Sequence, residues 1–279
     1  MALNLGVIGK IMEMDPFTYN EDAIILYALG IGAGLDELPF IYEKDLKVFP
    51  TFAVVPFGHG LFPFIEESNI NLFTLLHGEQ KITLHKPIPT AATISSVATC
   101  ESIWDKGDKG AVVTMKVESR DEKGELLFEN KALLMDRSGG NFGGERGPKT
   151  ESVNPPEGKA PDFSVSYTSS KDQAALYRLS GDKNPLHIDP EFAKMGGFDR
   201  PILHGLCSYG YAGRAILHSI CGGDPSKLKS FAVRFKGVVF PGDTMTTEGW
   251  KIEQGKYTIR TTTQDGREVL GNSLIEVDE

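Results

Sequence analysis

Residues 203–220, LHGLCSYGYAGRAILHSI, carry apolar side chains at helical spacing and are followed by a helix-ending pair, Gly222-Gly223. Four segments that alternate apolar and polar residues come next, separated by glycine-containing turns. These predicted strands are residues 230–239, 244–253, 257–263 and 269–277. The order predicts one apolar helix packed against an antiparallel sheet.

The rest of the chain repeats this order. In the second half, 163–167 reads as a strand and 174–179 as a short helix behind a Ser170–Gln173 capping box. In the first half, Asn20 can cap a helix that runs to Leu29. Further elements of the first half are a helical turn near 51–57 and strands at 79–85, 93–103, 111–119 and 126–136. Two such units predict an α+β fold built by duplication.

A glycine- and proline-rich stretch over residues 138–161 separates the two units. We therefore expect two domains, residues 1–150 and 151–279, each an antiparallel sheet that wraps a helix. The two sheets can join edge to edge, which would cover strands that are otherwise exposed.

Residues 181–187, GDKNPLH, place an acid and an imidazole on one short segment beside the predicted helix. Pro185 disfavours a continuous helix, so Asp182 and His187 should share a tight loop and could flank one water molecule. Gly-Asp and Asn-Pro are also ordinary turn dipeptides, so the alternative interpretation is a turn with no catalytic role.

A metal site is a second alternative for this segment. Asp182, His187, Asp189 and His204 are ligand types, but no His-x-x-x-His or Cys-x-x-Cys spacing supports such a site. We therefore expect no metal.

The longer string around this segment is specific. It reads YRLSGDKNPLH over 177–187, GGF over 196–198 and RPILHG over 200–205. It closely resembles the signature of the type 2 enoyl-CoA hydratases, the MaoC-like enzymes that include the hydratase domain of peroxisomal multifunctional enzyme type 2. Further similar stretches, in the same order along the chain, are 20–33, His77-Gly78, 105–107, 138–140, 142–144 and 233–235. The resemblance covers nearly the whole chain and implies a double hot-dog fold with an intact site in the second half.

The resemblance implies (3R)-specific hydration of trans-2-enoyl-CoA in fatty acid β-oxidation or related acyl-CoA metabolism. Adding water to an enoyl thioester needs a base for the water, an acid for the α-carbon and stabilisation of the thioester oxygen. We assign the base to His187 and the acid to Asp182, labels that can be exchanged, and expect Asn184 to hold the water or the reacting group. By resemblance, Gly205 donates its backbone N–H to the thioester oxygen.

The resemblance also implies that the first half binds substrate. Its His77, Gly78 and Lys106 would contact the acyl-CoA, and shed helix volume would accommodate the fatty acyl tail. Other expected substrate contacts are Lys183, Pro185, Leu186 and Phe235. On chemical grounds, Lys106, Lys109, Arg234 and Lys236 are candidates for the coenzyme A phosphates. Each of these residues also has an ordinary structural interpretation. His77-Gly78 could be a turn before a strand, the four cations could be solvated surface charges, and Phe235 could be a core aromatic residue.

Composition limits the partners. The net charge of −9, from 29 basic and 38 acidic residues, argues against nucleic acid, and no apolar stretch could span a membrane. No glycine-rich dinucleotide motif follows a strand, so coenzyme A enters only as part of the substrate and no cofactor is expected. The three cysteines form no close pair, which suits a reducing compartment.

The resemblance leaves the setting of the protein open. It implies a peroxisomal protein in a eukaryote, although the chain ends without a Ser-Lys-Leu address, and a cytoplasmic protein in a bacterium. The chain could form a homodimer or belong to a longer multifunctional chain. A hot-dog thioesterase, a dehydratase acting on acyl carrier protein and a noncatalytic acyl-CoA carrier remain the alternative functions.

Overall fold

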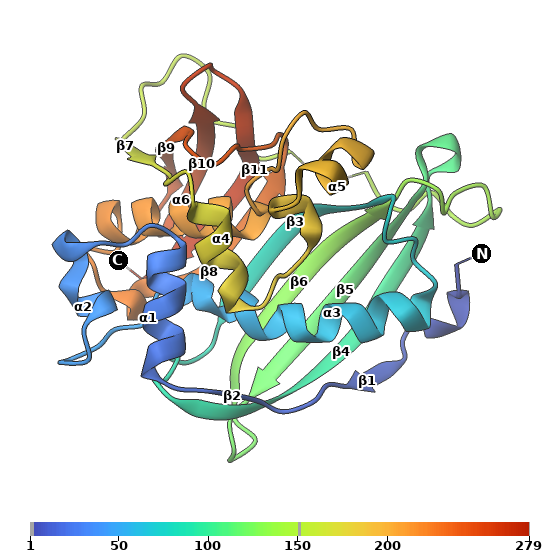
Figure 1. Ribbon diagram of the computed structural model, residues 1–279, viewed down its shortest axis with the longest axis horizontal. Helices are drawn as coiled ribbons and strands as arrows, with labels where there is room; N and C mark the ends of the chain where they lie inside the picture. Colours follow the sequence, from blue (N-terminus) through green and yellow to red (C-terminus); the bar gives the residue numbers. More distant parts are fainter. Residues whose placement is uncertain (1–2, 150–151, 279) are drawn as a thin grey trace.

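A computed structural model describes residues 3–149 and 152–278, and the eleven strands named within these ranges form one antiparallel sheet (Figure 1). The strands run in the order β1-β4-β5-β6-β3-β8-β11-β10-β9-β7, and β2 also pairs with β4. The first-half strands are β1 (Ile11–Glu13), β2 (Phe17–Tyr19), β3 (Leu75–Leu84), β4 (Ala92–Asp105), β5 (Ala111–Arg120) and β6 (Leu126–Asp136). The second-half strands are β7 (Phe163–Thr168), β8 (Leu228–Phe235), β9 (Thr244–Glu253), β10 (Lys256–Thr263) and β11 (Glu268–Val277).

The helices lie on one face of this sheet. The long ones are α3 (Val54–Ser68) in the first half and α6 (Gly205–Ser219) in the second. The shorter ones are α1 (Glu21–Gly30), α2 (Leu38–Ile41), α4 (Gln173–Tyr177) and α5 (Pro190–Met195). Figure 1 shows α3 along the first-half strands and α6 along the second-half strands, so each half has the predicted arrangement of a sheet around a helix.

Local sequence explains where several helices begin. The Asn20 side chain accepts a hydrogen bond from the Ala23 amide at the start of α1, as its capping position predicts. The Gln173 side chain accepts from the Ser170 amide, which confirms that half of the predicted capping box. The other Gln173 end donates to the carbonyls of Leu29 and Gly30 and so fixes α4 against α1 of the opposite half.

The two halves meet where β3 pairs with β8. Glu79 lies opposite Arg234, and Gln80 lies opposite Val233. The halves also share a core, because the larger buried cluster contains side chains from both, including Tyr27, Phe52, Ile82, Tyr209 and Phe231. The edge-to-edge joining that was considered from the sequence is therefore confirmed, and the halves form a single packed unit.

Three elements differ from the sequence prediction. The strand predicted over 230–239 is β8, which runs from Leu228 to Phe235 only. β3 begins at Leu75 rather than Glu79, because a bulge at Gly78 lets the strand continue past a residue that reads as a turn. The predicted turn near 51–57 falls on a 3-10 helix, Pro50–Ala53, and on the start of α3, which continues through Pro63 to Ser68. The first-half helix is not shorter than its counterpart, since α3 and α6 both contain 15 residues.

The connection between the halves contains no named strand or helix over its described part, residues 138–149 and 152–161, as its composition predicts. The expected domain boundary between residues 150 and 151 lies outside the described residues. Among the described helices, none combines the length and apolarity needed to cross a bilayer.

Candidate active site

The segment that carries Asp182 and His187 is a loop held by its own side chains. Asp182 Oδ1 accepts from the Asn184 amide at 3.1 Å, and Asn184 Oδ1 accepts from the Leu186 amide at 3.0 Å. Pro185 then begins a short 3-10 helix that ends at His187. Gly181 has φ of 126°, which glycine adopts without the penalty of a side chain. The predicted tight loop is confirmed.

His187 is oriented by the backbone and is 8% exposed. Its Nδ1 lies 2.9 Å from the Ile202 carbonyl oxygen, which can only accept, so Nδ1 carries the proton and Nε2 is left as an acceptor. Burial lowers the pKa of His187 below its ordinary value. A neutral imidazole with a free Nε2 is the form that a general base requires.

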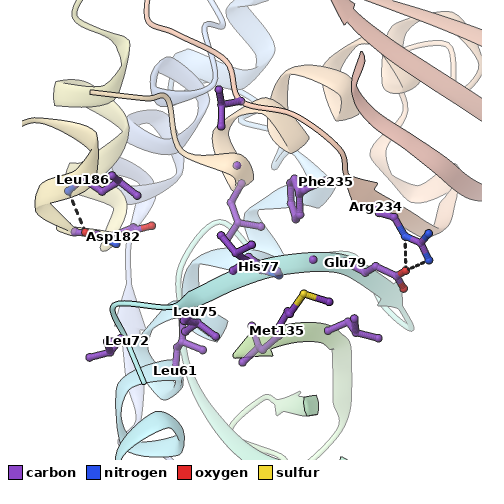
Figure 2. A pocket seen from close by; sticks show the side chains of 18 of the residues that line it. Leu61, Leu72, Leu75, His77, Glu79, Met135, Asp182, Leu186, Arg234 and Phe235 are labelled. Carbon is purple, nitrogen blue, oxygen red and sulfur yellow. Dashed lines mark hydrogen bonds and ion pairs between the residues drawn. The ribbon is translucent and has the colours of Figure 1, made fainter. Parts of the chain in front are cut away.

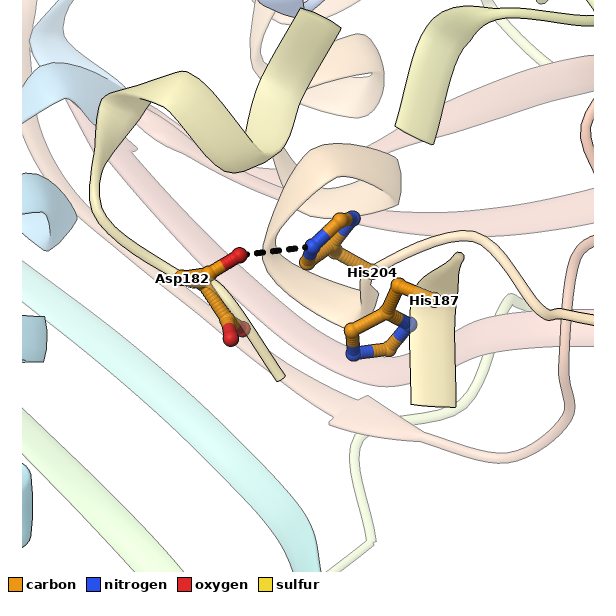
Figure 3. A group of neighbouring side chains, drawn as sticks. All are labelled: Asp182, His187 and His204. Atoms are coloured by element: carbon orange, nitrogen blue, oxygen red, sulfur yellow. Dashed lines mark hydrogen bonds between the residues drawn. The ribbon is translucent and has the colours of Figure 1, made fainter. Parts of the chain in front are cut away.

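His204 joins this pair, as Figure 3 shows. Its Nε2 donates to the Asp182 carbonyl oxygen at 3.1 Å, and its ring stacks on His187 with 3.8 Å between centroids. Burial lowers the pKa of His204 to about 3, so the imidazole is neutral. From the sequence, His204 was considered only as a metal ligand, although its place just before Gly205 was a usable signal.

The ligand atoms of Asp182, His187 and His204 all lie within 4.8 Å of one another. These are zinc-ligand types, and the two imidazoles each keep one ring nitrogen free of the backbone. Asp189, the fourth group of the metal alternative, instead caps α5 by accepting from the Glu191 and Phe192 amides. The same three groups can also bind a water molecule and move its protons.

The start of α6 lines the same cavity as these residues, through Gly205 and Leu206. Gly205 is the first residue of that helix, where backbone amides have no partner within the helix and the helix dipole is positive. A Cβ added to Gly205 would lie 3.2 Å from the Phe235 ring, so a side chain would press on this aromatic residue. The geometry suits binding of an oxygen that gains negative charge.

The first half contributes His77 to the same place. Its ring centroid lies 5.1 Å from that of Phe235, because β3 and β8 are neighbours in the sheet. Burial lowers the pKa of His77 to about 4, and the Asp182 charge opposes this shift. Gly78 forms the bulge beside it, where a Cβ would lie 3.2 Å from the Leu133 carbonyl.

One cavity of about 1910 Å³ connects these residues (Figure 2). It exceeds the roughly 300–1,000 Å³ of most small-molecule pockets, so it has room for a substrate as large as an acyl-CoA. Of the predicted site residues it is lined by His77, Gly78, Lys106, Asp182, Asn184, Pro185, Leu186, His187, Gly205 and Phe235. Lys183 is exposed and is not among the lining residues.

The cationic part of the lining differs from the sequence prediction. Arg234 and Lys236 line the cavity but are ion-paired, Arg234 with Glu79 and Lys236 with Glu268 at 2.8 Å, so a phosphate would compete with a carboxylate for each charge. The cavity lining also includes Lys106 and Lys109, together with three cations that were not predicted from the sequence, Lys131, Arg137 and Arg146. Lys131 is ion-paired with Glu101.

Two glycine pairs, Gly139-Gly140 and Gly143-Gly144, lie between Arg137 and Arg146 in the sequence. They were the signal from which a tight turn bringing these arginines to the site could have been predicted. Amides of Gly107, Asn141 and Gly143 donate to the Asp105 carboxylate and lower its pKa to about 2. This carboxylate therefore holds the start of the linker against the β4–β5 hairpin, beside Lys106 and Arg146. The Lys106 ammonium also donates to the Arg146 carbonyl.

Comparisons with known proteins agree with this geometry. Residues 152–271 match the MaoC like domain, and residues 17–138 match the MFE-2 hydratase 2 N-terminal domain. The 3-hydroxyacyl-thioester dehydratase Y of Mycobacterium tuberculosis is 40% identical over 291 residues, which cover 99% of both chains. The chain belongs to the family of MaoC-like dehydratases. The predicted family is thereby confirmed.

Two further comparisons bear on length and fold. Peroxisomal multifunctional enzyme type 2 of Drosophila melanogaster is 39% identical over 98% of this chain, which spans 49% of that relative. The crystal structure of a MaoC-like dehydratase from Phytophthora capsici matches with a TM-score of 0.87 and 33% identity, covering 99% of this chain and 97% of that one. A Mycobacterium tuberculosis structure described as a double hot-dog fold matches at 12% identity with a TM-score of 0.62, covering 97% and 96% of the two chains, which confirms the predicted fold.

Proposed function

We propose that the protein is a hydro-lyase that adds water to trans-2-enoyl-CoA and forms (3R)-3-hydroxyacyl-CoA, a reaction that also runs as dehydration. The observation that carries the proposal is the meeting of Asp182, a neutral His187 and the first amides of α6 at one cavity. The family membership and the hydratase and dehydratase names of the relatives support it. The setting is acyl-CoA metabolism such as β-oxidation.

The reaction uses the groups as follows. The water oxygen bonds to the β-carbon while one of the water protons moves to His187 Nε2, the free acceptor of that ring. Asp182, as the protonated carboxylic acid, supplies the proton that the α-carbon gains. In the exchanged assignment, the Asp182 carboxylate takes the water proton and a protonated His187 supplies the other. The charge that develops on the thioester oxygen is stabilised by the Gly205 amide at the start of α6. In each turnover, one of His187 and Asp182 gains a proton and the other loses one. Transfer of a proton between the two groups restores the starting state.

Asn184 and His77 position the reactants. Asn184 uses Oδ1 to cap the short helix, which leaves its amide nitrogen to donate toward the cavity. His77 is kept neutral by burial and lies against Phe235, so it lines the cavity as an uncharged polar surface. Both contacts orient the enoyl group between the acid and the base.

Coenzyme A is held as part of the substrate, with no further cofactor. Its phosphates fit the cations Lys106, Lys109, Arg137 and Arg146 at one end of the cavity. Among the residues expected to contact substrate, Gly78, Pro185 and Leu186 also line the cavity, whereas Lys183 has no place in it. Names of relatives favour the peroxisome if the protein is eukaryotic, and one of them is a multifunctional enzyme. For a bacterial protein we propose the cytoplasm, and for a separate chain a homodimer.

The decisive experiment mixes the protein with crotonyl-CoA and follows the loss of the enoyl absorbance, followed by chiral analysis of the product. Hydration to the (3R)-hydroxy product is the expected result. A (3S) product would contradict the family-based stereochemistry. Release of free thiol without hydration would identify a thioesterase, and tight binding without turnover would identify a carrier. Hydration of an enoyl group only on acyl carrier protein would identify the other dehydratase class.

A further inference from the structure

One face of α3 lies along the cavity. Val54, Gly58, Leu61 and Ile65 all line it, and their spacing of four, three and four residues puts them on a single stripe of the helix. Three of these residues carry branched apolar side chains. Gly58 is the member of the stripe that presents no side chain to the cavity.

Packing against the described side chains gives no reason for glycine at position 58. A Cβ added to Gly58 would have no described atom within 4 Å, and the backbone of Gly58 is not among those with positive φ. The glycines of α6 differ sharply in this respect. A Cβ on Gly210 would lie 2.3 Å from Ile31, and one on Gly213 would lie 2.5 Å from Thr51, so both are required for close packing. Since glycine weakens a helix interior, its presence at 58 calls for another explanation.

The chemistry of the cavity lining indicates which part of the substrate passes this stripe. Figure 2 shows Leu61, Leu72 and Leu75 gathered below His77. The cations that suit the phosphates of coenzyme A belong to the β4–β5 hairpin and the linker instead. An apolar tail gains free energy only from the apolar part of the lining, and the α3 stripe and these leucines form one such part.

We propose that Gly58 determines the length of acyl chain that the protein accepts, because its missing side chain keeps the acyl path along α3 open. This inference rests on the proposed hydratase function and names a feature that supplies the expected loss of helix volume. With α3 as long as α6, room for a tail comes from one absent side chain on the cavity stripe.

The test compares G58L with the unaltered protein on trans-2-enoyl-CoAs of four, eight, twelve and sixteen carbons. Filling the path should leave kcat/KM for crotonyl-CoA unchanged and reduce that for the twelve- and sixteen-carbon substrates by about ten- to a hundred-fold, the penalty that extra methylenes impose in a filled space. The matched control is G34L. Gly34 also has no atom within 4 Å of an added Cβ and has φ of −144°, but it is not among the cavity-lining residues.

Each outcome decides the proposal. An unchanged ratio of long- to short-chain kcat/KM in a folded G58L protein overturns it, and so does an equal loss on all four substrates. If G58L does not fold, G58A adds a single methyl group and must lower the same ratio in the same direction. Failure of the unaltered protein to hydrate crotonyl-CoA would instead overturn the proposed function, so the two failures are distinguishable.

Discussion

Replacing His187 by asparagine should remove catalysis while leaving the fold almost intact. The Asn side-chain amide can occupy the position of Nδ1 and donate to the Ile202 carbonyl, but no basic atom remains where Nε2 was. Loss of a positioned acid–base group typically costs about 10²- to 10⁴-fold in rate. We therefore expect kcat for crotonyl-CoA hydration to fall by that factor in H187N, measured by the enoyl absorbance.

Comparison with H187A separates chemistry from structure. Alanine removes the same base and also leaves the buried Ile202 carbonyl without its partner, which costs about 1–3 kcal/mol. At about 2–4 °C per kcal/mol for a chain of this size, the unfolding temperature of H187A should fall by about 2–12 °C, whereas H187N should stay close to the unaltered protein. Near-normal turnover in a folded H187N protein would refute the assignment of His187 to proton transfer.

Four further predictions follow from the same geometry. D182N should lose about 10²- to 10⁴-fold in hydration rate with little loss of stability, since its side-chain oxygen can still accept from the Asn184 amide; unchanged turnover would count against the acid–base pair. The folded pKa values of His77 and His204, about 4 and about 3, lie below the ordinary 6.5, so the unfolded chain binds more protons and stability should fall as the pH drops from about 6.5 toward 4. Each imidazole can change the free energy of unfolding by up to about 1.4 kcal/mol per pH unit. Denaturant unfolding at each pH measures this slope. A free energy of unfolding that does not change with pH would contradict the lowered pKa values. Prolonged treatment with a chelator should leave crotonyl-CoA hydration unchanged, whereas a loss that zinc restores would make the Asp–His–His cluster a metal site. Residues 155–279 alone should aggregate or lose activity relative to the full chain, because β8 would present an open edge; a monomeric fragment with unchanged kinetics would contradict this.

Much of the second half was predictable because its signals are local. The alternation that predicted strand 244–253 matches β9 residue for residue, and the apolar run from 203 predicted α6 to within two residues at its start. The loop around Pro185 was predictable for the same reason, since a proline and neighbouring Asx residues act over one turn. Local rules suffice where tertiary contacts agree with them.

The first half was harder because tertiary contacts override its local signals. Pro56, Gly58 and Pro63 read as helix breakers, yet α3 runs through all of them. Its buried aromatic residues, including Phe57 and Phe64, pack on the sheet and stabilise the helix against its poor propensity. Arg137 and Arg146 could not be placed from sequence either, because their approach to the cavity depends on the carboxylate of Asp105 gathering distant amides.

The joint between the halves explains why a duplicated fold needs both copies for one site. β8 ends at Phe235, whose ring lies beneath Gly205, and β3 runs beside it with the Gly78 bulge next to His77. The bulge inserts one residue, so His77 and Glu79 do not follow the simple alternation of a strand. Glu79 pairs with Arg234, while His77 contacts Phe235 within the cavity lining. A slip of one residue in this register would move His77 to the opposite face and remove it from the site without altering any catalytic side chain of the second half. The register of β3 against β8 is therefore part of the catalytic geometry as well as of the fold.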